Sequence, residues 1–229
     1  MAIYIYRPVP SESARALAAA VEGRKVSHIP KKLIRQDVVI GWGVRVPALR
    51  CKVLNGILVR GKFTDAEILT NAGVPTITVS RTHQDGWIGR SNHHVGGNDL
   101  LWPPRTVDYW VKREEIVKEF RVHSFKGRSL RAGIKVHRTG FETPHEWIRS
   151  WDGGWRISYD GESVKQKHRD LAHRAIEALG LDFGAVDIGQ LKDKTLIVLE
   201  VNRAPGIENG TVGVYAKAIR EWADSREVE

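Results

Sequence analysis

Apolar and polar residues alternate over long stretches in the second half of the chain, a pattern that predicts antiparallel strands. Residues 117–125 place polar side chains on one face and aromatic or branched side chains on the other. A Lys-Gly-Arg turn follows at 126–128, and residues 129–137 continue as the return strand of a hairpin. Two further apolar runs, at 183–189 and 195–202, are separated by a polar turn and predict a second hairpin.

The register of the first hairpin determines which of its polar side chains meet. If the loop holds three residues, Arg121 lies opposite Gly133. The same register places Glu119 opposite Lys135, and His123 shares their face of the sheet. We therefore expect the polar faces of both strands to point into one site.

The first 55 residues predict a small α/β unit. A strand at 2–6 leads into an Ala-rich helix at 11–22, which a glycine ends. Buried strands are expected at 38–43 and 51–54, because each is a short apolar run that ends in a glycine-containing turn.

Two segments have the spacing of a capping box, in which a hydroxyl residue is followed three positions later by Glu or Gln. Thr64 and Glu67 predict a short helix that closes near Gly73. Ser163 and Gln166 predict the start of a longer amphipathic helix. That second helix is expected to end at a glycine at position 180.

The composition is that of an ordinary globular protein. Among the 229 residues, 41% are hydrophobic and 28% are charged, which argues against a disordered chain. No apolar run approaches the roughly 20 residues that cross a bilayer, so no membrane association is expected. The single cysteine, Cys51, excludes an internal disulfide and favours a reducing cytoplasm as the location.

The chain is basic, with 36 Lys and Arg against 27 Asp and Glu and a formal charge of +9. A basic surface can bind nucleic acid, and cations can instead gather around a polyphosphate ligand. General solubility is a third explanation. Because the sequence contains no long Lys/Arg block, the charge favours anionic ligands without identifying one.

Three oxygen-bearing side chains lie on the predicted second hairpin. Alternation places Glu200 and Asn202 on one face of the strand that Pro205 and Gly206 terminate, and Asp187 lies on the neighbouring strand. Two carboxylates and an amide suit Mg²⁺ or Mn²⁺, whereas the imidazole and thiolate ligands of zinc are missing. The alternative interpretation is a polar strand end near solvent.

Residues 179–188 (LGLDFGAVDI) and 199–206 (LEVNRAPG) together resemble the C-terminal signature of ATP-grasp ligases. The similarity is closest to RimK-like carboxylate–amine ligases and to the small ATP-grasp proteins of phages. The resemblance implies that Asp187, Glu200 and Asn202 hold Mg²⁺ ions that bridge the phosphates of ATP.

The resemblance also extends to earlier segments. It implies that Arg121 and Lys135 face the phosphates or the acyl intermediate as catalytic cations. Arg90 stands where the family more often has lysine, and a glycine loop beside it would cover ATP. Residues 109–112 occupy the place of the linker that contacts adenine, largely through its backbone. The residues expected to contact ATP are Lys62, Arg90, Gly96, Gly97, Trp110, Val111, Lys112, Glu119 and Arg121.

The expected fold class is therefore α/β (α+β), as an ATP-grasp fold. Residues 1–55 would form a pre-grasp-like α/β lobe. Residues 56–112 would form the small ATP-grasp lobe with the glycine loop and hinge. Residues 113–229 would form the C-terminal lobe that carries the metal site.

The function that this resemblance implies is ATP-dependent ligation of a carboxylate to an amine through an acylphosphate, with release of ADP and phosphate. The partners would be ATP, an acid and an amine, either of which could be a metabolite, a peptide or a polymer. A kinase acting on a hydroxyl is one alternative. Another is a nucleic-acid-binding protein on an inactive scaffold, and an enzyme acting on modified DNA combines both ideas. A phage-type protein would act in the host cytoplasm.

Overall fold

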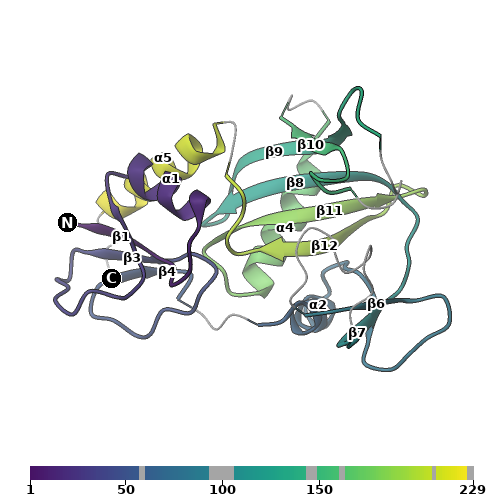
Figure 1. Ribbon diagram of the computed structural model, residues 1–229, viewed down its shortest axis with the longest axis horizontal. Helices are drawn as coiled ribbons and strands as arrows, with labels where there is room; N and C mark the ends of the chain where they lie inside the picture. The colour runs from purple at the N-terminus through teal and green to yellow at the C-terminus, as the bar shows by residue number, and fades with distance from the viewer. Residues whose placement is uncertain (57–59, 93–105, 143–148, 160–162, 208–209, 226–229) are drawn as a thin grey trace.

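The computed structural model of the chain describes residues 1–56, 60–92, 106–142, 149–159, 163–207 and 210–225. These residues form a four-stranded, a three-stranded and a five-stranded sheet, with helices packed against them (Figure 1). No helix among the described residues combines the length and the apolar character that crossing a membrane requires.

The N-terminal sheet is parallel, with the strand order β2-β1-β3-β4. Its strands are β1 (Ile3–Tyr6), β2 (Arg24–Val26), β3 (Val38–Gly41) and β4 (Lys52–Leu54). Helix α1 (Glu12–Ala20) begins at Ser11, whose hydroxyl accepts a hydrogen bond from the Ala14 N–H at 3.2 Å. The predicted elements of this unit are thus confirmed, with slightly shorter bounds.

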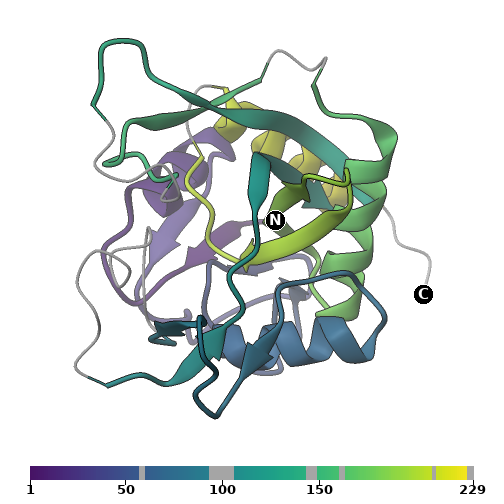
Figure 2. The same cartoon turned by 90° about the vertical axis from the view of Figure 1, so that its right-hand side faces the viewer.

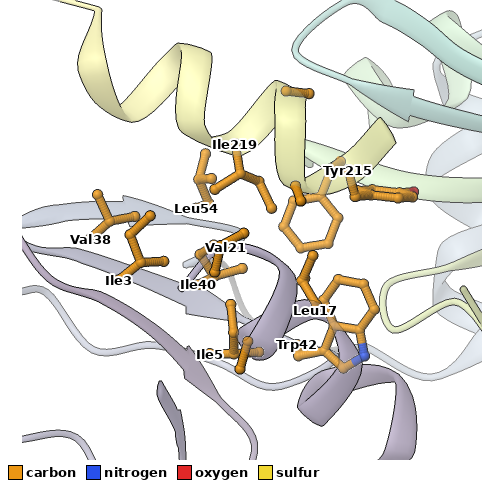
Figure 3. Close-up of a cluster of buried hydrophobic side chains, with 14 of the residues drawn as sticks. Ile3, Ile5, Leu17, Val21, Val38, Ile40, Trp42, Leu54, Tyr215 and Ile219 are labelled. Atoms are coloured by element: carbon orange, nitrogen blue, oxygen red, sulfur yellow. The ribbon is translucent and has the colours of Figure 1, made fainter. Parts of the chain in front are cut away.

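The C-terminal helix α5 (Thr211–Asp224) packs against α1 and completes the core of this N-terminal unit (Figure 1). Its Tyr215 and Ile219 lie among the apolar side chains of the N-terminal sheet, beside Leu17 and Trp42 (Figure 3). All four side chains are completely buried. The two ends of the chain therefore fold into one core.

The small lobe consists of helix α2 (Lys62–Asn71) and a three-stranded antiparallel sheet. Its strand order is β5 (Val79–Ser80), β7 (Tyr109–Val111) and β6 (Ile88–Arg90). The capping box predicted at Thr64 was wrong, because α2 begins at Lys62 and its N-cap is Gly61, three residues before the predicted one. Figures 1 and 2 both show this lobe below the edge strand of the large sheet.

The large sheet is antiparallel, with the order β10-β9-β8-β11-β12. Its strands are β8 (Ile116–Phe125), β9 (Arg128–His137), β10 (Trp155–Ser158), β11 (Phe183–Leu191) and β12 (Leu196–Asn202). Helix α4 (Gln166–Ala178) packs on one face of this sheet through Leu171, Ala172, Ala175 and Ile176, all of which are buried. The opposite face of the sheet carries the polar side chains of β8 and β9, including Glu119, Arg121 and Lys135.

The second predicted capping box was also wrong. Helix α4 begins at Gln166, and its N-cap is Lys165. The backbone N–H of Lys165 donates to Nδ1 of His168 at 3.0 Å, so a histidine takes the place of the expected Ser–Gln pair. The predicted end is confirmed, since Gly180 adopts a positive φ of 66° directly after the helix.

The β8–β9 hairpin has the predicted register through a different turn. Its loop holds two residues, Lys126 and Gly127, both with positive φ, as a tight hairpin turn of this kind requires. A β-bulge after His123 then adds one residue, so that Arg121 still pairs with Gly133. The predicted loop length was wrong, and the predicted facing of side chains is confirmed.

Strand β10 and the residue after it approach the backbone of β9 closely at Gly133. A Cβ there would collide with the carbonyl oxygen of Ser158 and would lie 2.9 Å from Cδ1 of Tyr159. We expect Gly133→Ala to destabilise the protein by ~1–3 kcal/mol, measured by urea unfolding, because the strand pair has no room for a methyl group. Gly213→Ala in α5 is the control, since nothing lies within 4 Å of its added Cβ. Equal unfolding midpoints for the two variants would contradict this packing.

Candidate active site

The three oxygen-bearing side chains predicted from sequence lie together on β11 and β12. Asp187 pairs directly with Glu200 across the two strands, beside a β-bulge in which Leu199 of β12 is the extra residue. The Asn202 amide lies 3.5 Å from Oδ2 of Asp187. Within the described ranges no group of three or more His, Cys, Asp or Glu could hold a metal, so a cation here would need the amide oxygen as its third ligand.

Asp187 is held by a two-point ion pair with Arg121 from the adjacent strand β8. The Arg121 Nε donates to Oδ1 at 2.6 Å and the Nη2 to Oδ2 at 2.7 Å. Burial on its own would raise the pKa of Asp187, but the charges of Arg121 and Lys135 outweigh it and hold that pKa at about 2. The carboxylate is therefore ionised at neutral pH, and Oδ1, which accepts one hydrogen bond from Arg121, keeps a lone pair for a cation.

Glu200 is held from the small lobe. Lys62, at the first position of α2, donates to Oε2 of Glu200 at 2.9 Å. The lysine that the sequence placed among the ATP contacts thus lies beside one of the expected metal ligands. Because hard cations prefer carboxylate and amide oxygens, this set of donors fits Mg²⁺ or Mn²⁺ better than zinc.

A second ion pair joins the same two elements and was missed from sequence. Arg203, directly after β12, donates to both carboxylate oxygens of Asp65 in α2, at 2.7 and 2.6 Å. Both side chains are about nine-tenths buried, and burial raises the pKa of Asp65. The available signal was the position of Arg203 immediately after Asn202 in the predicted ligand segment.

Glu119 and Lys135 meet on the pocket face of β8 and β9, as the register predicted. Lys135 Nζ donates to Oε2 of Glu119 at 2.7 Å, and Nη1 of Arg149 lies 3.6 Å from Oε1. The Arg149 Nη2 also donates to the Ile116 carbonyl at 2.9 Å, although sequence reasoning gave this arginine no role. Arg121, Lys135 and Arg149 therefore bring positive charge to this side of the pocket.

Of the expected hinge residues 109–112, Trp110 alone does not line the pocket. Strand β7 lies between β5 and β6, so the sheet already uses the backbone hydrogen-bonding groups of Trp110. The Trp110 ring packs edge-on against His83 at 4.4 Å and does not line the pocket. Val111 and Lys112 do line it, together with residues 113, 114 and 116. The segment after β7 is therefore better placed for an adenine contact than Trp110.

The glycine loop at Gly96 and Gly97 lies outside the described residues. Arg90, at the end of β6 and just before that segment, lines the same pocket as Arg121 and Glu200. This position is compatible with the hypothesis that Arg90 contacts the phosphates of ATP. The contact itself stays a prediction until a nucleotide is bound.

The pocket itself lies between the small lobe, the large sheet and the ends of the N-terminal strands, and its volume is about 1110 Å³. Of its described lining residues, eleven are Lys or Arg and five are Asp or Glu. Such an excess of positive charge in a concave site concentrates anions there. A large part of the chain's net charge of +9 is thus located at one cavity rather than over a flat surface.

His123 is the next residue on the polar face of β8 and is completely buried. Burial, aided by the charge of Arg121, lowers its pKa to about 3, so the ring is neutral at physiological pH. Arg131 acts in the same direction and Asp187 opposes it. The sequence could not decide whether this histidine lies in the site or caps a polar face.

The buried neutral His123 should make stability depend on pH. Its pKa is lower in the folded than in the unfolded chain, so its contribution is complete above pH 6.5. As the pH falls from 6.5 towards 3, the unfolded chain binds a proton that the folded chain does not. We expect a loss of about 1.4 kcal/mol per pH unit relative to His123→Gln. Urea unfolding of both proteins at pH 7, 6 and 5 measures this loss of stability. The same change in unfolding free energy with pH in the wild-type protein and in His123→Gln would contradict the prediction.

Comparison with known proteins supports the fold. No protein-family model and no curated protein sequence matches the chain. Among solved structures, the ATP-grasp ligase PsnB complexed with a minimal precursor is similar over 96% of this chain and 99% of its own, with a TM-score of 0.65 and 12% identity. D-cycloserine synthetase DcsG covers 98% and 100%, with a TM-score of 0.63 and 16% identity.

A third similar structure is the macrocyclase MdnC from Microcystis aeruginosa MRC, bound with the precursor peptide MdnA. It covers 98% of this chain and 100% of its own, with a TM-score of 0.58 and 11% identity. Because these matches extend over nearly the full length, the chain has the ATP-grasp fold. The fold predicted from the sequence is thereby confirmed.

Proposed function

We propose that this protein is an ATP-dependent carboxylate–amine ligase. The observation that carries the proposal is the convergence of Asp187, Glu200 and Asn202 with Arg121 and Lys62 in one cationic pocket. The ATP-grasp fold supports the proposal as well, and the cationic pocket lies between the small lobe and the large sheet. We also propose lobe boundaries at residues 55 and 112, with helix α5 of the C-terminal part packing into the core of the N-terminal lobe.

The nucleotide would lie along the polar face of β8. Its base would meet the segment after β7, and its phosphates would meet Arg90, Arg121 and Lys135. Asp187, Glu200 and Asn202 would hold Mg²⁺. The bound ion would neutralise negative charge on the phosphate oxygens. Lys62 and Arg121, which pair with Glu200 and Asp187 here, would then exchange these carboxylates for phosphate oxygens.

The chemistry that follows requires positioning rather than a covalent nucleophile. A substrate carboxylate oxygen would bond to the γ-phosphorus of ATP, and ADP would leave with the electrons of the broken P–O bond. Arg121 and Lys135 would stabilise the charge on the transferring group. The amine nitrogen would then bond to the acyl carbon, and inorganic phosphate would leave and take up the proton lost from nitrogen.

The pocket charge favours this function over nucleic-acid binding. A duplex would need cations spread along an exposed surface, whereas here eleven basic residues line one cavity. Two of the similar structures, PsnB and MdnC, contain a bound precursor. A peptide carboxylate or peptide amine is therefore one substrate class to include in a test.

The test is a screen for ADP release across pairs of carboxylates and amines, with product masses read by mass spectrometry. A ligase releases ADP only when both partners are present and yields an amide. Release with an alcohol and no acid would instead identify a kinase, the alternative that the same pocket could support. Salt-sensitive binding of DNA or RNA without ATP turnover would overturn both.

A further inference from the structure

His123 connects two tyrosines, one buried and one in the pocket. Its Nδ1 lies 3.3 Å from the Tyr215 hydroxyl, and its Nε2 lies 3.2 Å from the Tyr159 hydroxyl. Tyr215 in turn donates to the carbonyl oxygen of Gly184 at 3.2 Å. Tyr215 and His123 are fully buried, whereas Tyr159 lines the pocket. The chemistry proposed above uses none of these groups.

These hydrogen bonds link Gly184, Tyr215, His123 and Tyr159 in a row. The direction of each one follows from the buried Gly184 carbonyl at the inner end. A carbonyl oxygen can only accept, so the Tyr215 hydroxyl must donate to Gly184. The Tyr215 oxygen therefore accepts from Nδ1–H of His123. A neutral imidazole has one N–H, which leaves Nε2 as an acceptor, and Tyr159 must donate to it. The Tyr159 proton is thus directed inward, and only oxygen lone pairs face the pocket.

Tyr159 is held in place by packing on both sides. The guanidinium of Arg131 lies 3.8 Å from the centre of its ring, and Gly133 leaves the space that the ring edge occupies. The Nη1 of Arg131 also donates to the Thr211 hydroxyl at 3.1 Å, which fixes the guanidinium. The acceptor is therefore a fixed feature of the pocket wall.

The position of Tyr159 along the site also matters. Glu119, Arg121 and His123 follow one another at every second residue of β8, so they are spaced by about 7 Å. Glu119 is nearest the hinge, and Arg121 holds Asp187 at the expected metal site. The Tyr159 hydroxyl meets His123 and so lies one step further from the hinge than Arg121, and Tyr215 on the other side of His123 packs against Trp42 of the N-terminal core.

We propose that the Tyr159 oxygen accepts an N–H from the attacking amine, and that His123 fixes this polarity as a positioning residue. This inference rests on the proposed ligase function. A neutral amine has N–H donors and one lone pair, and the lone pair must be free to attack the acyl carbon. A hydroxyl that donated into the pocket would occupy that lone pair. An acceptor at the same place binds the N–H and leaves the lone pair free.

The polarity can be tested without any substrate. In protein labelled with ¹⁵N-histidine, the His123 ring signals are identified by their loss in His123→Gln. At pH 7 we expect the neutral tautomer with the proton on Nδ1, read from the distinct shifts of protonated and unprotonated ring nitrogens. A proton on Nε2, or on both nitrogens, would overturn the proposal.

The role towards the amine is tested with Tyr159→Phe, which keeps the ring and removes the hydroxyl. With the acid found by the ADP-release screen and ¹⁸O-labelled ATP, positional isotope exchange reports acylphosphate formation without amine. We expect this exchange to stay within about twofold of wild type. With hydroxylamine as the probe nucleophile, we expect KM for the amine to rise about tenfold, the size of one lost hydrogen bond. Tyr4→Phe, outside the pocket lining, is the matched control.

The outcomes separate the two proposals. Normal exchange with an unchanged KM for hydroxylamine in Tyr159→Phe would refute the role of Tyr159 alone. Absence of exchange in the wild-type protein with every acid tested would refute the ligase itself, and the amine contact with it. Loss of exchange in Tyr159→Phe would show that the tyrosine serves the first step, which also contradicts the inference.

Discussion

Replacing Glu200 with glutamine is expected to lower Mg²⁺-dependent ATP turnover by about 100-fold or more while the protein stays folded. Glutamine keeps the shape of the side chain and an oxygen that can still meet Lys62, whose Nζ lies 2.9 Å from the carboxylate. It removes one of the two carboxylates that face the expected cation, and hard divalent cations depend on that charge. ADP release at saturating Mg²⁺, with circular dichroism for the fold, measures both effects.

The control for this variant is Glu221→Gln in α5, a half-exposed carboxylate that pairs with Arg128 outside the pocket. It should leave ATP turnover unchanged. Equal turnover in Glu200→Gln and the wild-type protein would remove Glu200 from the metal site. A common loss in both variants would point to a general effect of charge.

The largest effect on stability is expected for Arg203→Ala. Asp65 is nine-tenths buried and each of its carboxylate oxygens accepts a hydrogen bond from Arg203, so the variant would leave a buried carboxylate without this partner. Breaking such a pair typically costs about 3–5 kcal/mol, measured here as the free energy of unfolding in urea. The pair joins α2 to the end of β12, so the loss should also loosen the small lobe from the large sheet.

Two further variants decide whether the charge is the cause. The double replacement Arg203→Leu with Asp65→Leu removes both charges and should recover most of the lost stability. Lys192→Ala breaks the exposed pair with Glu115 and should leave the unfolding midpoint unchanged. A double variant as unstable as Arg203→Ala would show that packing of the arginine stem, rather than the unpaired charge, dominates.

The strands that carry the expected metal ligands could be predicted from the sequence because strand alternation has a period of two residues. Once Glu200 and Asn202 are assigned to one face, Asp187 on the neighbouring strand follows, and the structure pairs it with Glu200. The β8–β9 register was predicted for a similar reason. A two-residue turn with one bulge has the same effect on register as the three-residue loop that was assumed.

The ion pairs between the lobes could not be predicted in this way. Lys62 and Glu200 are 138 positions apart, as are Asp65 and Arg203, and no local pattern links them. Helix starts failed for a different reason. Capping boxes are weak local preferences, and tertiary packing placed the N-caps at Gly61 and Lys165 instead. The role of Tyr159 also depends on a contact with His123 that only the folded chain creates.

The central claim is that the pocket activates a carboxylate by transfer of the γ-phosphoryl group of ATP. The most direct test uses the acid and amine that the ADP-release screen identifies, with the acid labelled by ¹⁸O in its carboxylate. The ligase account predicts that one ¹⁸O atom moves from the acid to inorganic phosphate for each amide formed. Amide formation with unlabelled phosphate, or with ¹⁸O in AMP, would contradict it.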